Sequence, residues 1–240
     1  MESFDEEFFR PLGLRVQTLP AIKCRGTGVK TVFSRIRNAA EAVMMNNRFL
    51  MSLGGEHSIT VPLAEAARSV HGKDICVLNL DSHLDLRDCF NNSLFSHGCV
   101  FRRIMDMHIP VIHAGIRSLC REEYDLVRRN HLDVFWARDI HSTKNDNWIR
   151  AIVRRLKKKV YLSIDIDVLD PSIMPGTGTP EPGGLAWHTV LKLLRQVCLA
   201  RKVVAADIVE VIPLPDIPVC EYVAAKLALK VMTYCSGNFR

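Results

Sequence analysis

Acidic residues and histidines recur at alternate positions in two short segments of this 240-residue chain. The first segment reads Asp-Ser-His-Leu-Asp at 81–85, and the second reads Asp-Ile-Asp at 165–167. Alternate side chains of an extended segment point the same way, so each segment is able to present its ligand groups together. A further histidine follows a Gly-Gly-Glu sequence. The six candidate metal ligands are His57, Asp81, His83, Asp85, Asp165 and Asp167.

These six residues suit a pair of divalent metal ions. Crowded carboxylates raise one another's pKa values and are costly to bury unpaired, and a cation removes both problems. Four carboxylates and two imidazoles exceed what one tetrahedral zinc takes, and they include no thiolate. We therefore expect two ions bridged by shared carboxylates, with Mn2+ favoured. Because two ions about 3.5–4 Å apart lower the pKa of a bridging water, the predicted chemistry is metal-assisted hydrolysis.

Short apolar runs of strand length alternate with segments whose apolar residues have helical spacing. The predicted strands cover residues 49–53, 75–80, 111–114, 134–136, 160–164 and 203–208. The predicted helices cover residues 29–46, 62–70, 100–107, 122–129, 148–156, 188–199 and 219–234. This order predicts an α/β fold, a three-layer sandwich with a mostly parallel central sheet. The candidate ligands follow the ends of several predicted strands, where such sheets bind ligands, so we expect them to converge.

Composition narrows the class of protein. With 48% hydrophobic and 24% charged residues, the chain reads as globular rather than disordered. No charge-free run exceeds 13 residues, which predicts no membrane span, and the start lacks a signal-peptide pattern, which predicts a cytoplasmic protein. The eight cysteines include no Cys-x-x-Cys pair, which disfavours a zinc ribbon. The basic run at 154–159 has no interleaved aromatic residue, so no nucleic-acid partner is expected despite the net charge of +6.

Longer blocks of the chain resemble the signatures of the ureohydrolase family, which includes arginase and agmatinase. The blocks are Gly-Gly-Glu-His-Ser-Ile-Thr at 54–60, Leu-Asp-Ser-His-Leu-Asp-Leu-Arg-Asp at 80–88 and Ser-Ile-Asp-Ile-Asp-Val-Leu-Asp-Pro at 163–171. Shorter matches occur at 96–98, 115–118 and 207–211. The likeness covers roughly residues 45–235 and is strongest to archaeal-type agmatinases. It implies the arginase/deacetylase-like form of the predicted α/β sandwich.

The resemblance also implies a role for each candidate residue and two Mn2+ ions per chain. One ion would bind His57, Asp81, Asp85 and Asp165, and the other would bind Asp81, His83, Asp165 and Asp167, with Asp81 and Asp165 bridging. His97 matches the family histidine that shuttles protons, and Glu210 matches the acid that receives the guanidinium group. The implied reaction is hydrolysis of a small guanidino substrate to urea and an amine.

Two departures from arginase indicate which guanidino compound fits. Arginases carry an acid shortly after the Gly-x-Arg segment for the α-amino group, whereas residues 118–120 here are Ser-Leu-Cys. The loop at 86–95 also lacks the arginase Ser-Gly-Asn pattern. We therefore expect agmatine, cleaved to putrescine in polyamine biosynthesis. The alternatives are another ω-guanidino acid such as 4-guanidinobutyrate, whose carboxylate Arg87, Arg102 or Arg117 would meet, and a metal-binding relative without catalysis.

The whole chain, residues 1–240, reads as a single ureohydrolase domain. Compared with the family it lacks an amino-terminal strand, which would leave one edge of the sheet uncovered. The resemblance implies a homo-oligomer, either a trimer or a hexamer. Ser82 stands where the family more often has alanine, and we expect this small difference to be tolerated.

Overall fold

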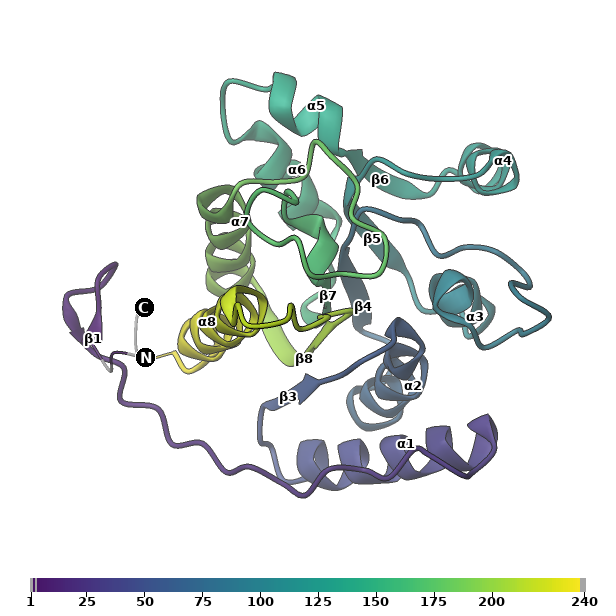
Figure 1. Ribbon diagram of the computed structural model, residues 1–240, viewed down its shortest axis with the longest axis horizontal. Coiled ribbons are helices and arrows are strands. Elements are labelled where there is room, and N and C mark those ends of the chain that lie inside the picture. The colour runs from purple at the N-terminus through teal and green to yellow at the C-terminus, as the bar shows by residue number, and fades with distance from the viewer. Residues whose placement is uncertain (1, 3, 238–240) are drawn as a thin grey trace.

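A six-stranded parallel sheet forms the centre of the molecule in the computed structural model, which describes residue 2 and residues 4–237 (Figure 1). The strands lie side by side in the order β3-β8-β7-β4-β5-β6. Their bounds are β3 Leu50–Leu53, β4 Ile75–Leu80, β5 Val111–Ile116, β6 Asp133–Trp136, β7 Lys159–Asp165 and β8 Lys202–Val209. Every neighbouring pair is parallel, so the carboxyl ends of all six strands meet at one edge of the sheet.

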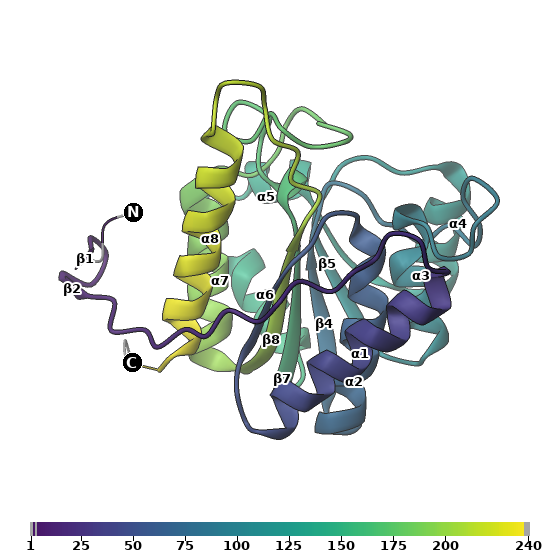
Figure 2. The same ribbon diagram turned by 60° about the horizontal axis from the view of Figure 1, so that its bottom comes forward.

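Helices cover both faces of this sheet, which gives three layers (Figure 2). One face is covered by α1 (Val29–Met45), α2 (Thr60–His71), α3 (Val100–Asp106) and α4 (Arg121–Asn130). The other is covered by α5 (Ala137–Ser142), α6 (Asn147–Arg155), α7 (Trp187–Ala200) and α8 (Val219–Cys235). Three single turns of 3-10 helix, η1 (His57–Ile59), η2 (His97–Cys99) and η3 (Ile166–Val168), lie in the loops that follow β3, β4 and β7.

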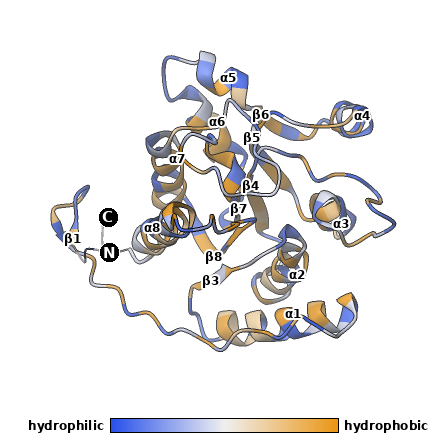
Figure 3. Cartoon of the chain, viewed as in Figure 1, coloured by the Kyte–Doolittle hydropathy of each residue, from blue (hydrophilic) through white to orange (hydrophobic). Residues whose placement is uncertain are grey.

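Strand β4 shows why this sheet has two apolar cores. All six of its residues are buried. Cys76 and Leu78 pack into the core beneath α6, α7 and α8, whereas Ile75 and Val77 pack into the core beneath α1, α2 and α3. Side chains alternate between the two faces of a strand, so a strand covered on both faces is apolar at nearly every position. The helices that cover the sheet carry both hydrophobic and hydrophilic residues (Figure 3).

The predicted three-layer α/β fold is confirmed, and each predicted strand and helix is present with both ends within two residues of its predicted bounds. The prediction missed α5 and two strands of two residues each, because segments this short carry no measurable periodicity. Among the described helices, none combines the length and the apolar character needed to cross a bilayer.

The two short strands, β1 (Phe4–Asp5) and β2 (Arg10–Pro11), form an antiparallel hairpin beside α8 (Figure 2). From this hairpin, residues 12–28 run as an irregular and largely exposed segment to the start of α1. Within the described part of the chain β3 pairs with β8 alone, so its outer edge carries no strand.

Candidate functional site

The candidate residues gather at the carboxyl edge of the sheet. Asp81 directly follows β4, Asp165 is the last residue of β7, and Glu210 directly follows β8. His57 begins η1, in the loop that follows β3. Because β8, β7 and β4 are neighbours in a parallel sheet, their ends bring these side chains together from segments far apart in the sequence.

His57 lies at the centre of a buried group of carboxylates. Its Nδ1 atom is 3.2 Å from Oδ2 of Asp85, 3.2 Å from Oδ2 of Asp165 and 3.6 Å from Oδ2 of Asp81. Nδ1 is nevertheless buried without a hydrogen-bond partner among the described residues. A buried nitrogen that faces three acids without bonding to any of them has the surroundings of a metal ligand.

A second group adjoins the first and shares Asp81 with it. Nδ1 of His83 lies 3.0 Å from Oδ2 of Asp167 and 3.8 Å from Oδ1 of Asp81. In each of the two groups, one His57–Asp81–Asp85 and the other Asp81–His83–Asp167, the potential ligand atoms all lie within 4.8 Å of one another. The structure thus brings all six predicted ligands together. Their function as ligands stays a prediction.

The electrostatics of these groups favour a bound cation. Burial, followed by repulsion from neighbouring carboxylates, raises the pKa of Asp81 well above its ordinary value. Burial and the charge of Asp167 likewise raise the pKa of Asp165. For Asp167 itself burial is outweighed by hydrogen bonds from His83 and Ser82, so its pKa is lowered. The chain holds more negative charge here than its own groups neutralise, and this donor set of oxygens and imidazoles fits divalent ions such as Mn2+.

A buried polar network fixes the orientation of His57. Nε2 of His57 is 3.0 Å from Oγ of Ser163, and this hydroxyl donates in turn to Oδ1 of Asp207 at 2.8 Å. Oδ2 of Asp207 accepts hydrogen bonds from the hydroxyls of Thr60 and Tyr161. Such outer partners of a ligating histidine set its tautomer and its ring orientation. We did not predict this network from the sequence, although its signal is present, namely polar residues inside otherwise apolar strands.

Glu210 and His97 flank the six residues. Oε1 of Glu210 accepts a hydrogen bond of 2.7 Å from the backbone N–H of His57. Burial raises the pKa of Glu210. Nδ1 of His97 lies 3.6 Å from Oε1 of Glu56, and this carboxylate raises the pKa of His97. The charges of Asp85 and Glu210 act on the pKa of His97 in the same sense.

The three arginines considered for a substrate carboxylate have other partners. The guanidinium of Arg117 donates to the backbone carbonyls of residues 115, 167, 181 and 182 at 2.7–3.3 Å. Arg102 pairs with Asp106, and Arg87 lies 5.0 Å from the centre of the Phe90 ring. Arg117 therefore acts as a clamp between loops, and this arrangement weakens the case for a guanidino acid.

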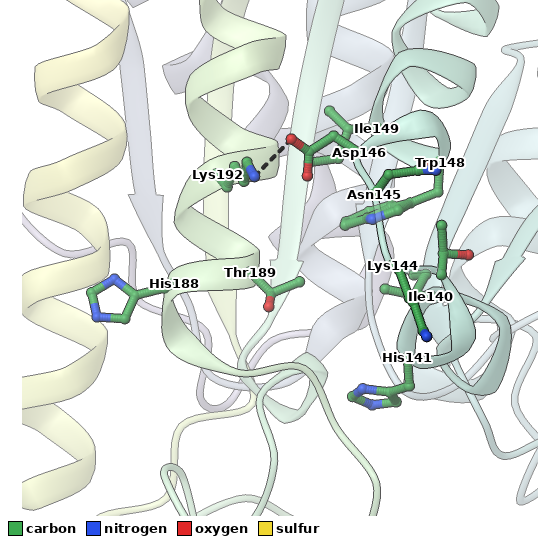
Figure 4. Close-up of a pocket in the computed structure, with 11 residues that line it drawn as sticks. Ile140, His141, Lys144, Asn145, Asp146, Trp148, Ile149, His188, Thr189 and Lys192 are labelled. Carbon is green, nitrogen blue, oxygen red and sulfur yellow. Dashed lines mark ion pairs between the residues drawn. The ribbon is translucent and has the colours of Figure 1, made fainter.

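A separate cavity of about 350 Å³ lies between the loop that joins α5 to α6 and the first turns of α7 (Figure 4). Its lining includes His141, Lys144 and His188, together with Lys192, which forms an ion pair of 2.7 Å with Asp146. None of the predicted site residues lines this cavity. It is therefore distinct from the group of acids at the strand ends.

Known proteins resemble this chain in both sequence and structure. The model of the arginase family matches residues 3–234. An N(1)-aminopropylagmatine ureohydrolase of Synechocystis is 40% identical over 196 residues, which are 81% of this chain and 63% of the relative. An agmatinase of Pyrococcus horikoshii is 39% identical over 177 residues, which are 73% of this chain and 59% of the relative. The chain thus spans about three fifths of the length of these curated relatives.

Solved structures with a similar fold include further ureohydrolases. The crystal structure of the agmatine ureohydrolase of Thermoplasma volcanium superposes with a TM-score of 0.83 at 28% sequence identity, covering 98% of this chain and 79% of that one. An arginase from Bacillus cereus at 24% identity, covering 87% of this chain and 78% of that one, has a TM-score of 0.76 and shows the shared fold alone. The expected likeness to ureohydrolases is confirmed, and this chain belongs to the arginase family.

Proposed function

We propose that this protein hydrolyses a guanidino compound to urea and a primary amine, with agmatine as the substrate and putrescine as the product. The observation that carries the proposal is the pair of His/Asp groups that share Asp81, with Glu210 directly beside His57. Membership of the arginase family and relatives named agmatinase and N(1)-aminopropylagmatine ureohydrolase support it.

Two Mn2+ ions fit the six residues. The proposed ligands are His57, Asp81, Asp85 and Asp165 for one ion and Asp81, His83, Asp165 and Asp167 for the other. When bound, the ions supply a nucleophilic water at neutral pH and neutralise the charge that develops on the substrate. The chain's own contribution is to hold the ligands in place, through Ser163 for His57 and through Ser82, whose hydroxyl is 2.7 Å from Oδ2 of Asp167.

Glu210 is the proposed binding group for the guanidinium. A planar guanidinium donates parallel hydrogen bonds, so a carboxylate is its natural partner. The backbone of His57 fixes Oε1 of Glu210. A Cβ atom at Gly178 would lie 3.7 Å from Oε2, so the glycine leaves space next to this second oxygen. Glu210 thus holds the guanidinium carbon next to the acids that would bind the metal ions.

His97 is the proposed proton donor to the departing amine. The neighbouring Glu56 raises its pKa, so the imidazole keeps its proton closer to neutral pH. Its side chain is half exposed and packs edge-on against Phe90, with the ring centres 5.4 Å apart. From this place at the rim, His97 gives a proton to the nitrogen of the leaving amine and takes one back from solvent.

Other substrates remain alternatives. N(1)-aminopropylagmatine is one, from the name of the Synechocystis relative. A guanidino acid such as 4-guanidinobutyrate is less favoured, because Arg117 bonds to backbone carbonyls. A metal-binding relative without catalysis is the remaining alternative. A single domain, a cytoplasmic location and a trimeric or hexameric assembly stay predictions from the sequence.

Urea release by the Mn2+-loaded chain from agmatine, N(1)-aminopropylagmatine, arginine and 4-guanidinobutyrate tests the proposal. We expect agmatine to be cleaved and arginine to be left intact. Cleavage of another compound in the set would keep the reaction and change the substrate. Two bound Mn2+ ions per chain without urea from any compound would contradict the proposed activity and favour the non-catalytic alternative.

A further inference from the structure

An acidic residue from a distant part of the chain lies beside residues 118–120, which contain no acid themselves. No acid occupies residues 118–120, which follow the Gly-Ile-Arg segment. Glu181 nevertheless reaches this segment from a distant loop, and its Oε1 accepts a hydrogen bond of 2.9 Å from the hydroxyl of Ser118. The backbone of Ser118 bonds to Ser82 and forms a bridge with His83. The carboxylate of Glu181 therefore bonds to a residue whose backbone pairs with that of a predicted metal ligand, on the β5 side of the site.

The loop that carries Glu181 is fixed at this residue and directly after it. Arg117 donates to the carbonyl oxygen of Glu181 at 2.7 and 3.1 Å. Oδ2 of Asp170 accepts hydrogen bonds from the backbone N–H groups of Gly183 and Gly184 at 3.0 and 2.9 Å. A side chain on a backbone held in this way needs less ordering when a ligand binds than one on a free loop.

The Glu181 side chain feels the charge of the Arg117 guanidinium, which bonds to the Glu181 carbonyl, but it forms no direct ion pair within the described residues. Among the described residues, no lysine, arginine or histidine forms a side-chain ion pair with it, and only one of its two oxygens accepts a hydrogen bond. The side chain is partly exposed, as are Ser118 and His83. A partly exposed carboxylate with an open oxygen attracts a primary ammonium group and repels a carboxylate.

Glu210 and Glu181 stand at opposite ends of the candidate metal site. Glu210 follows β8, and the partner of Glu181, Ser118, follows β5, with β7 and β4 between them. Three strand intervals of about 4.8 Å separate these ends by about 14 Å. An extended guanidinoamine with four carbons covers a similar span. Its covalent bonds are each about 1.5 Å long, and a hydrogen bond of about 3 Å is added at each end.

We propose that Glu181 binds the distal ammonium group of the substrate while Glu210 binds its guanidinium group. This assignment rests on the proposed hydrolase function and deepens it, because it makes the substrate a guanidine with a positively charged tail. An acid contributed by a loop that is remote in sequence thus performs the amine recognition for which residues 118–120 offer no acid.

The test compares Glu181→Gln with the unaltered Mn2+-loaded protein on agmatine and on butylguanidine, which lacks the amine. Glutamine keeps an acceptor for Ser118 and removes the charge. We expect KM for agmatine to rise about tenfold or more, the equivalent of one charged hydrogen bond, while KM for butylguanidine stays the same. Asp74→Asn is the matched control, because this exposed acid precedes β4 at the opposite edge of the sheet and its loss changes the net charge equally. The control should leave both KM values unchanged.

Equal rises of KM for agmatine and butylguanidine would show a structural effect and overturn the assignment, as would no rise for agmatine. Calorimetry with 1,4-diaminobutane separates this inference from the proposed activity. If the unaltered protein releases no urea from any guanidine, the hydrolase proposal fails. Diamine binding that weakens about tenfold in Glu181→Gln would still support the amine site. Equal binding by both proteins, or none by the unaltered protein, would overturn it.

Discussion

Two groups of crowded acids in this molecule differ in where their neutralising cation comes from. The first, the Lys230 cluster, consists of Asp5, Glu6, Glu7 and Lys230 and joins the amino-terminal hairpin to α8. The second, the strand-end cluster, consists of His57, Asp81, Asp85 and Asp165. In the first, Nζ of Lys230 lies 2.9–3.4 Å from all three carboxylates, and the side chains of Lys230 and Asp5 are each only 2% exposed. In the second, the acids face a histidine nitrogen that forms no hydrogen bond with them.

The pKa values of the acids differ accordingly. Burial would raise the pKa of Asp5, but the hydrogen bond from Lys230 and two backbone N–H groups lower it below its ordinary value. Burial and neighbouring acids raise the pKa of Asp81 and Asp165 well above theirs, in spite of His57. The Lys230 cluster is complete within the chain, whereas the strand-end cluster fits a cation from outside it. The stability of the strand-end cluster should therefore depend on Mn2+, whereas that of the Lys230 cluster should depend on Lys230.

The largest effect is expected from removing a shared ligand in the strand-end cluster. Mn2+ at about 1,000 times its dissociation constant should stabilise the unaltered chain by about 4 kcal/mol, because it binds the folded state alone. Asp81→Asn should lose most of this gain, since both proposed metal groups use Asp81. Thermal melts with EDTA and with Mn2+ measure the difference.

The metal-free Asp81→Asn protein should melt no lower than the metal-free unaltered chain, because the substitution removes one of the repelling charges. Asp74→Asn should retain the full Mn2+ effect. An equal Mn2+ effect in Asp81→Asn and in the unaltered protein would contradict the assignment of Asp81 as a shared ligand.

The stability that the Lys230 cluster contributes should depend on the lysine of the chain itself and not on Mn2+. Lys230→Met should destabilise the fold by about 3 kcal/mol, because it leaves the buried carboxylate of Asp5 without its cationic partner. This value is at the low end for buried pairs, because Asp5 keeps two backbone N–H partners and Glu6 is exposed. The loss should be the same with and without Mn2+. Adding Asp5→Asn to Lys230→Met should restore part of the stability, as a double-mutant cycle in urea denaturation will show. Additive losses would mean that the two residues do not interact.

A smaller effect is expected from pH, because only the strand-end cluster should make the stability of the metal-free chain depend on it near neutrality. Burial is outweighed by neighbouring carboxylates, which raise the folded-state pKa of His57 well above its ordinary value of 6.5, so above pH 6.5 the native state holds a proton that the unfolded state has lost. The metal-free chain should therefore lose stability between pH 7 and 8, by about 1.4 kcal/mol per pH unit for each such proton. His113, whose pKa burial lowers to about 3, is neutral in the folded state and mostly neutral in the unfolded state over this range.

The Lys230 cluster should be insensitive to this change of pH. The pKa of Asp5 is lowered, so its contribution is complete above its ordinary value of 3.8, and the raised pKa of Lys230 keeps its contribution complete below 10.5. Urea denaturation in EDTA at pH 7 and 8 should show a slope that Asp81→Asn reduces and Lys230→Met retains. A slope unchanged by Asp81→Asn would place its source outside the strand-end cluster.

The fold could be predicted from the sequence because its strands are buried on both faces. Strand β4 has no exposed residue, and such a strand reads as a nearly continuous apolar run, here interrupted only by Asn79. The hairpin of residues 4–11 could not be predicted in the same way. It is attached through contacts such as that between Asp5 and Lys230, which are 225 positions apart, and no local pattern signals them.

The site was predictable to the same extent and for a similar reason. Its six proposed ligands lie in short motifs at strand ends, where a parallel sheet brings distant segments together. The partners of those ligands were not visible. We expected Ser82 to be a tolerated difference, yet its hydroxyl contacts both Asp167 and His83. Arg117, a candidate for a substrate carboxylate, holds two loops together instead, and Glu181 contacts Ser118 across 63 positions.

The smallest predicted effect tests whether the Lys230 cluster stabilises the fold through burial of its ion pair or through the number of its charges. Glu6 lies 3.2 Å from Nζ of Lys230, but its side chain is 66% exposed. Ion pairs with exposed groups contribute little because water screens them, so Glu6→Gln should cost less than about 0.5 kcal/mol. Asp5→Asn, at a similar distance but buried, should cost several times more. Urea denaturation of the two variants decides between burial and charge number, since equal losses would mean that Lys230 responds only to how many carboxylates surround it.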